Sequence, residues 1–175
     1  DVRAPHRCHA DPAEGGRKVI VRRDRSGRTV ELTPKGFNAR TRVHEYGGGD
    51  FLVAERSLYF SNFSDQRLYR VDPGTSPEPF SPPGAYLYAD GIVDGPRRRI
   101  ITVREDHAVS EQDAQNAIVA MPLGDGPVRM LVQGANFYSS PRLSPDSAHL
   151  AWLSWDHPNM PWDGTDLWVA PVQRD

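Results

Sequence analysis

The sequence predicts an all-β protein made of antiparallel four-stranded blades, a partial β-propeller with about three blades' worth of strands. Its apolar segments are short, about four to eight residues, and are bounded by turn-forming residues. No convincing helical window longer than about ten residues occurs. Equivalent third strands begin at Arg67, Asn116 and Asp166, at spacings of 49 and 50 residues. A four-stranded repeat of this length is typical of a propeller blade.

The first 16 residues lack apolar periodicity, and we expect a poorly ordered leader over 1–16. His6, Cys8 and His9 carry side chains that ligate soft metals. Three such side chains without a second cluster do not match a closed zinc site, so we expect no metal and no cofactor. Cys8 is the only cysteine, which excludes an intramolecular disulfide and favours a reducing compartment.

The remainder, 17–175, is predicted to be the partial propeller. Two short strands around the Asp24–Gly27 turn form a half blade over 17–34. An irregular segment then ends in three glycines, Gly47 to Gly49, which indicate a close backbone approach or a bulge. Two complete blades follow over 46–81 and 86–133, and an incomplete blade over 137–172 lacks its fourth strand.

Charge and hydropathy exclude several classes of partner. The net charge is −2, which gives no basis for nucleic acid or an anionic membrane surface as partner. No apolar run approaches the roughly 20 residues that a membrane-spanning helix needs. The first residues do not resemble a signal peptide, so we expect a cytoplasmic location. A removed N-terminal signal remains compatible with a chain that begins at Asp1.

Several motifs resemble the propeller repeat of TolB and of the prolyl oligopeptidase family. The Leu143–Asp146 turn (LSPD) precedes an apolar strand, and Asp166–Val169 (DLWV) follows it, with Ser147 where the family usually has Gly. Four further stretches resemble the acylaminoacyl-peptidase-like or dipeptidyl-peptidase-like branch of serine peptidases: RVHEYGGG (42–49), YFSNFSD (59–65), VREDH (103–107) and WDHPNMPW (155–162).

The resemblance implies a propeller that precedes an α/β-hydrolase domain with a Ser-Asp-His triad. This chain contains no G-x-S-x-G nucleophile elbow, so we expect no catalytic residue and no peptide hydrolysis by the chain alone. The implied function is to gate and orient small peptides for that hydrolase domain, its expected partner. The alternatives are a non-catalytic TolB-like protein-binding propeller and a truncated product without independent activity. Unfinished blades also have free strand edges, so self-association through these edges is a further expectation.

Two clusters of ionisable residues are candidate substrate-binding sites. His44 and Glu45 lie beside the three glycines, where they either face a substrate terminus or hold the turn by bonding backbone groups. In Arg104, Glu105 and Asp106, the carboxylates suit a peptide's amino terminus and the guanidinium suits a carbonyl or carboxylate. The alternative is a structural salt bridge. Strand alternation puts Glu105 on the face opposite Arg104 and Asp106, so the three cannot act together.

Four tryptophans crowd the last blade. Trp152 and Trp168 are expected in the core between blades. Trp155 and Trp162 flank the loop at 157–161 and are the better candidates for binding. The Asp156–His157 pair is interpreted as structural, with the carboxylate capping a turn and the ring packing, because no nucleophile is near it in sequence.

Overall fold

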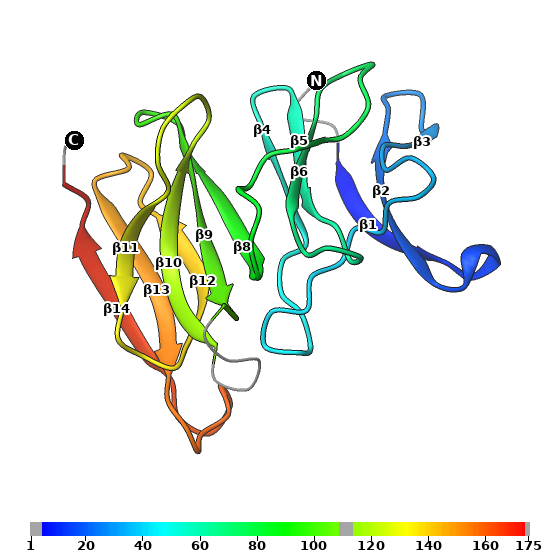
Figure 1. Cartoon of the computed structure of the whole chain (residues 1–175). Coiled ribbons are helices and arrows are strands. Elements are labelled where there is room, and N and C mark those ends of the chain that lie inside the picture. The colour runs from blue at the N-terminus through cyan, green and yellow to red at the C-terminus, as the bar shows by residue number, and fades with distance from the viewer. Residues whose placement is uncertain (1–4, 109–113, 174–175) are drawn as a thin grey trace.

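A computed structural model describes residues 5–108 and 114–173, and it confirms the all-β class and the blade-like organisation. Within these residues, fourteen strands form four antiparallel sheets of three or four strands, each of them a meander. In Figure 1 the sheet β1–β3 lies on the right, β4–β7 in the middle, and the two later sheets on the left. The order in space therefore follows the order along the chain, as expected for successive blades.

The first sheet corrects the predicted leader. β1 (His6–Asp11) pairs along its whole length with β2 (Arg17–Arg23), and β3 (Thr29–Glu31) pairs with the other edge of β2. A short 3-10 helix, η1 (Pro12–Glu14), joins β1 to β2. Backbone pairing to β2 orders the segment without any apolar face of its own, so its lack of periodicity was a misleading signal. The prediction of a poorly ordered segment is wrong for residues 6–14.

The second and third sheets each have four strands, and the fourth sheet has three. Their order in space follows the chain, which requires only hairpin connections within each sheet. The strands are β4 (Phe51–Ala54), β5 (Ser57–Ser61), β6 (Leu68–Val71) and β7 (Glu78–Pro79); β8 (Tyr86–Asp94), β9 (Arg99–Asp106), β10 (Gln115–Pro122) and β11 (Arg129–Gln133); and β12 (Phe137–Leu143), β13 (His149–Trp155) and β14 (Asp166–Pro171).

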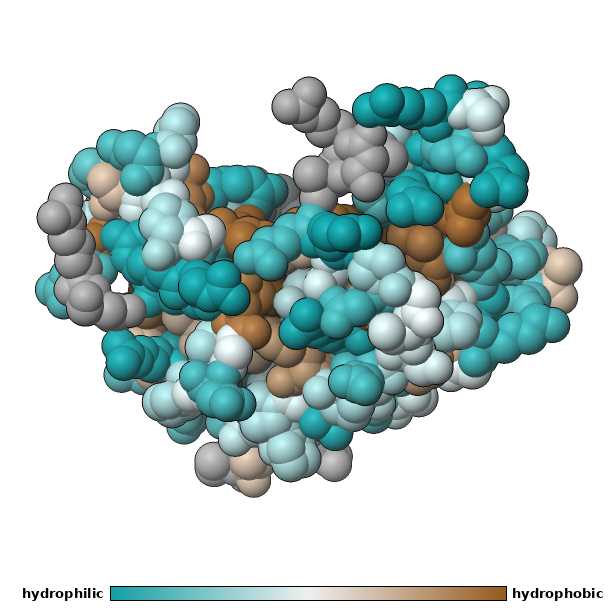
Figure 2. Space-filling model, turned by 90° about the horizontal axis from the view of Figure 1, so that it is seen from above, coloured by the Kyte–Doolittle hydropathy of each residue, from teal (hydrophilic) through white to brown (hydrophobic). Residues whose placement is uncertain are grey.

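The first strands of successive sheets contact one another: β8 packs beside both β4 and β12. Apolar side chains from both faces of β9 and β10 fill the spaces on either side, so these two strands are almost entirely buried. Ile101, Val103 and Ile118 pack toward the last sheet, against Tyr138 and Trp152. Figure 2 shows hydrophobic residues toward the middle of the molecule and hydrophilic residues around its periphery. Trp152 thus lies between blades, as predicted.

Trp168 does not. It is 50% exposed, and its indole Nε1 donates a hydrogen bond to Ser154 Oγ at 3.0 Å. Its strand, β14, is the last strand of its sheet and is exposed over most of its length. Alternation correctly predicted a strand here, but burial of Trp168 depends on a neighbour across its face, and the described chain provides none.

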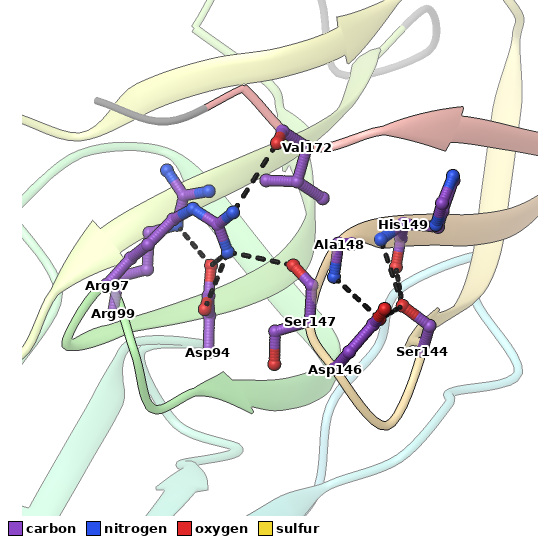
Figure 3. A network of polar contacts seen from close by, with 9 residues as sticks. All are labelled: Asp94, Arg97, Arg99, Ser144, Asp146, Ser147, Ala148, His149 and Val172. Atoms are coloured by element: carbon purple, nitrogen blue, oxygen red, sulfur yellow. Dashed lines mark hydrogen bonds and ion pairs between the residues drawn. The ribbon is translucent and has the colours of Figure 1, made fainter.

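A buried ion-pair network connects the last two sheets at one of their ends. The Asp94 carboxylate is fully buried and accepts hydrogen bonds from Arg99 Nε at 2.8 Å and from Arg97 Nη1 at 3.2 and 3.3 Å. Arg97 also donates to the carbonyl oxygens of Ser147 and Val172, which belong to the next sheet (Figure 3). Breaking such a buried pair would leave an uncompensated charge, so the network locks these sheets together.

The Ser-Pro-Asp turn at 144–146 has a local explanation in the same view. Asp146 accepts hydrogen bonds from Ser144 Oγ at 2.6 Å and from the backbone N–H of Ala148 at 3.0 Å (Figure 3). Ser144 Oγ in turn accepts the backbone N–H of His149. These bonds satisfy the groups of the β12–β13 turn and lower the pKa of the exposed Asp146 carboxyl.

In the described part of the chain, no helix is long and apolar enough to cross a lipid bilayer.

Candidate functional site

A cavity of about 600 Å³ opens at the end of the sheets opposite the Asp94 network. Three parts of the chain meet there: the turn after Val43, the end of β9 with the start of β10, and the β12–β13 pair with the loop that follows it. The lining residues are His44, Glu45, Tyr46, Glu105, His107, Ala114, Asn116, Asn136, Phe137, Trp155, His157, Asn159 and Met160.

The turn at His44 and Glu45 has a backbone that few sequences allow. Both residues have positive φ, 56° and 65°, and Gly47 follows at 93°. The backbone N–H of Glu45 donates to Arg42 O and that of Gly47 donates to Val43 O, which closes the turn. Backbone hydrogen bonds therefore hold this turn, and both His44 and Glu45 line the cavity.

The next two glycines allow the turn to lie against β8. A Cβ atom on Gly48 would lie 3.0 Å from the Ala89 side chain, and one on Gly49 would lie 3.0 Å from Asp90 Oδ1. The backbone N–H of Gly49 donates to Asp90 Oδ1 at 2.6 Å, and the Asp90 N–H donates back to Gly49 O at 3.0 Å. The predicted close backbone approach at the glycines is confirmed.

Glu105 and His107 lie on the cavity side of β9, whereas Arg104 and Asp106 do not line it. Glu105 is buried, and both carboxylate oxygens are engaged: Oε1 accepts the His44 backbone N–H at 2.7 Å, and Oε2 lies 3.3 Å from His107 Nε2. Because these contacts satisfy the carboxylate, Glu105 positions the turn and the ring of His107.

Arg104 and Asp106 lie close to each other on the opposite face of β9. Their closest charged atoms are 3.8 Å apart, and the Arg104 guanidinium lies over the ring of Tyr86 at 4.9 Å. Asp106 Oδ1 also accepts the backbone N–H of Ala108. Strand alternation thus correctly separated Glu105 from these two residues.

Aromatic rings form the walls of the cavity. Phe137 and Trp155 are cross-strand partners with ring centroids 5.4 Å apart and nearly parallel planes. The His44 ring lies 5.1 Å from Trp155, and the His157 ring packs edge-on against Phe137 at 4.8 Å. Tyr46, with its ring 5.5 Å from that of His44, is 58% exposed and lies at the rim.

Of the two tryptophans predicted to bind substrate, only one lies at the cavity. Trp155 lines the cavity, but Trp162 does not and is 74% exposed. Asp156 Oδ1 accepts the Asn136 backbone N–H at 2.6 Å, so the carboxylate caps the turn as predicted. Across the described residues, no group of three or more His, Cys, Asp or Glu side chains is placed to hold a metal ion.

Nine of the thirteen residues that line the cavity were not among the site residues predicted from the sequence. Tyr46, Phe137 and His157 are aromatic residues next to or paired with predicted site residues, so proximity in the blade repeat was an available signal. Asn116 offered a sharper one. It is a polar residue at the start of an otherwise apolar strand, and it is buried.

The described fold is similar to solved structures of peptidases. A puromycin-hydrolyzing peptidase of Mycobacterium tuberculosis is 39% identical with a TM-score of 0.83, over 96% of this chain and 28% of that one. A puromycin hydrolase is 34% identical with a TM-score of 0.87, over 96% of this chain and 29% of that one. A mutant of puromycin hydrolase complexed with PGG is 34% identical with a TM-score of 0.88, over 97% and 29%.

The chain belongs to the propeller portion of the prolyl oligopeptidase family. It spans less than a third of the length of these peptidases, and their hydrolase domain lies beyond the region matched. No protein-family model and no curated protein sequence matches the chain significantly. The identity of 34–39% nevertheless extends over nearly the whole chain. It indicates that this propeller segment of the prolyl oligopeptidase family is homologous to the matched peptidases and does not merely share their fold.

Proposed function

We propose that this propeller segment gates and orients small peptides for a hydrolase domain, and that the aromatic cavity binds the amino-terminal end of the peptide. The similar peptidases hydrolyse puromycin according to their names, and one of them is complexed with PGG, so small molecules are the relevant class of substrate. Without a catalytic triad of its own, the segment contributes selection and positioning.

The observation that carries this proposal is the free carboxylate of Glu45 at the rim of an aromatic-walled cavity. Within residues 5–108 and 114–173, the Glu45 side chain has no hydrogen-bond or ion-pair partner, and it is exposed. A carboxylate beside aromatic faces suits an ammonium group, because the charge pair and the ring quadrupoles both favour a cation.

Glu45 therefore takes the role that sequence analysis assigned more broadly to several acidic residues. Glu105 supports it indirectly, since its hydrogen bond to the His44 backbone fixes the turn that presents Glu45. Arg104 and Asp106 lie on the other face of β9, and Trp162 lies away from the cavity, so none of these three belongs to the proposed site.

Calorimetric titration of the full chain with Phe-Gly-Gly and N-acetyl-Phe-Gly-Gly tests the proposal. We expect the free-amine peptide to bind about tenfold more tightly, because acetylation removes the charge that pairs with Glu45. The variant Glu45→Gln should reduce this preference to about twofold or less. Glu78→Gln, an exposed carboxylate in β7 away from the cavity, is the matched control and should leave the preference unchanged.

Equal binding of the two peptides by the unmodified chain would contradict a role for the amino terminus. Absence of binding by either peptide would contradict the proposed peptide site altogether.

A further inference from the structure

Two arginine side chains without an acidic partner lie beside the turn that carries Glu45. Arg40 and Arg42 are both exposed, and their guanidinium carbons lie 5.0 and 5.8 Å from the centroid of one ring, that of Phe63. In the part of the chain that the structure describes, neither guanidinium has a hydrogen-bond or ion-pair partner. Both therefore keep their N–H donors for a ligand.

The carboxylates of the adjoining segments are held by other donors. Asp50 accepts the backbone N–H of Thr41 at 2.8 Å and pairs with Lys18 Nζ at 3.1 Å. Asp65, in the turn between β5 and β6, accepts the hydroxyl of Tyr69 at 2.7 Å. Two cations that converge on one ring without a counter-charge repel each other, and an anionic ligand that binds both of them relieves this repulsion.

Backbone hydrogen bonds fix the positions from which the two arginines extend. The Arg40 N–H donates to Ser61 O at 2.9 Å, and the Arg42 N–H donates to Oε1 of the buried Gln66 at 2.8 Å. Because the main chain is held and both side chains pack on a ring, a ligand orders little that is not already ordered. The planar guanidinium fork matches the two oxygens of a carboxylate.

The arginine pair and the free carboxylate of Glu45 lie at the two ends of one tight turn. The backbone N–H of Glu45 donates to Arg42 O at 2.7 Å, and the end residues of such a turn have Cα atoms within about 7 Å of each other. From these ends the Arg42 side chain extends to Phe63, whereas Glu45 lines the aromatic cavity. An extended tripeptide is about 10 Å long, which suits a turn lengthened by its two side chains.

We propose that Arg40 and Arg42 bind the terminal carboxylate of a short peptide whose amino end lies at Glu45. This inference rests on the proposed binding of a peptide's amino terminus and adds a contact to the opposite end of the ligand. The two cations also offset the repulsion between that carboxylate and the acidic side chains that line the cavity. A ligand long enough to reach both contacts binds more tightly than a ligand that makes only one of them.

Calorimetric titration of the full chain with Phe-Gly-Gly and Phe-Gly-Gly-amide tests the inference, since amidation removes the charge at the carboxyl end. We expect the peptide with the free carboxylate to bind about tenfold more tightly. In the double variant Arg40→Gln, Arg42→Gln, the two affinities should become equal within about twofold, with the amide bound as in the unmodified chain. The double variant Arg7→Gln, Arg23→Gln removes two charges from exposed positions in the first sheet and should keep the tenfold preference.

Equal affinities for the two peptides in the unmodified chain would overturn this inference and leave the amino-terminal site standing, because the acetylated peptide tests that site separately. A preference for the free carboxylate that persists in a folded Arg40→Gln, Arg42→Gln variant would also overturn it. Absence of binding by either peptide would overturn the proposed function, and this inference with it. The comparison in the unmodified chain is decisive even when the double variant fails to fold.

Discussion

Single residues in this protein carry roles that depend on burial more than on chemical type. Glu45 and Glu105 are both carboxylates at the cavity, yet only Glu45 is free to meet a ligand. The sequence placed both near a substrate, and it correctly separated Glu105 from Arg104 by strand alternation. It did not reveal that the Glu105 oxygens are occupied, because the donors come from His44, 61 positions away, and from His107.

His44 is expected to make stability depend on pH. Its pKa is lowered in the folded protein by burial, from an ordinary value of 6.5, so the unfolded chain binds the proton more readily. Its contribution to stability is thus fully present above about pH 6.5 and is lost as the pH falls through the folded-state pKa. We expect a lower free energy of unfolding at about pH 5.5 than at about pH 7.5 in urea titrations.

The variant His44→Asn should lose much of this dependence, since Asn accepts the positive φ of the turn and does not titrate. His149→Asn, at an exposed position in β13, is the matched control and should retain it. An unchanged difference between the two pH values in folded His44→Asn would rule out His44 as the responsible group.

At the scale of elements, the blades are held together where their first strands bulge. β8 and β12 each lose register against their neighbour, after Ala89 and after Ser139, and the residues at the bulges, Asp90 and Ser140, have positive φ. The Asp90 carboxylate accepts the backbone N–H of Gly49 on one side and that of Ser140 on the other, at 2.6 and 2.9 Å. One side chain therefore links three successive sheets.

Asp90→Asn should destabilise the protein by about 1–3 kcal/mol. The amide retains the side chain's shape and its tolerance of positive φ, but it presents an NH₂ group to one of the two backbone N–H donors. Urea unfolding followed by circular dichroism measures the loss. Asp125→Asn, at an exposed turn between β10 and β11, should change stability by less than about 0.5 kcal/mol. A similar small change in Asp90→Asn would show that the link is dispensable.

The elements themselves were largely predictable, for a physical reason. Short apolar strands and turn residues act locally, and the 49- and 50-residue spacings aligned one blade with the next. The exception is β1 (His6–Asp11), whose order comes from backbone bonds to β2 across η1. Main-chain pairing of this kind leaves no pattern in the side chains, so the same reasoning that found the other strands failed there.

At the scale of the whole molecule, the fold follows from the repeat, but burial at its ends does not. Trp152 and Trp168 occupy cross-strand partner positions in the same sheet, and only Trp152 has a neighbouring sheet to cover it. A repeat unit buries its faces against its neighbours. The position of a blade within the array therefore decides whether a side chain is buried, which the sequence pattern of the blade alone does not show. The free side of the last sheet is also where association is expected.

β14 combines an unpaired edge with exposed apolar side chains, since Leu167 is 71% and Val169 is 63% exposed. Edges of this kind pair with other strands, and lysine on an edge opposes such pairing. We therefore expect the chain to self-associate with rising concentration in analytical ultracentrifugation, and the double variant Leu167→Lys, Val169→Lys to remain at the mass of one chain. Met130→Lys, at an exposed apolar position on the outer strand β11, is the control and should associate like the unmodified chain. A monodisperse monomer at about 100 μM before any substitution would contradict this prediction, because edge-driven association operates at micromolar to millimolar concentrations.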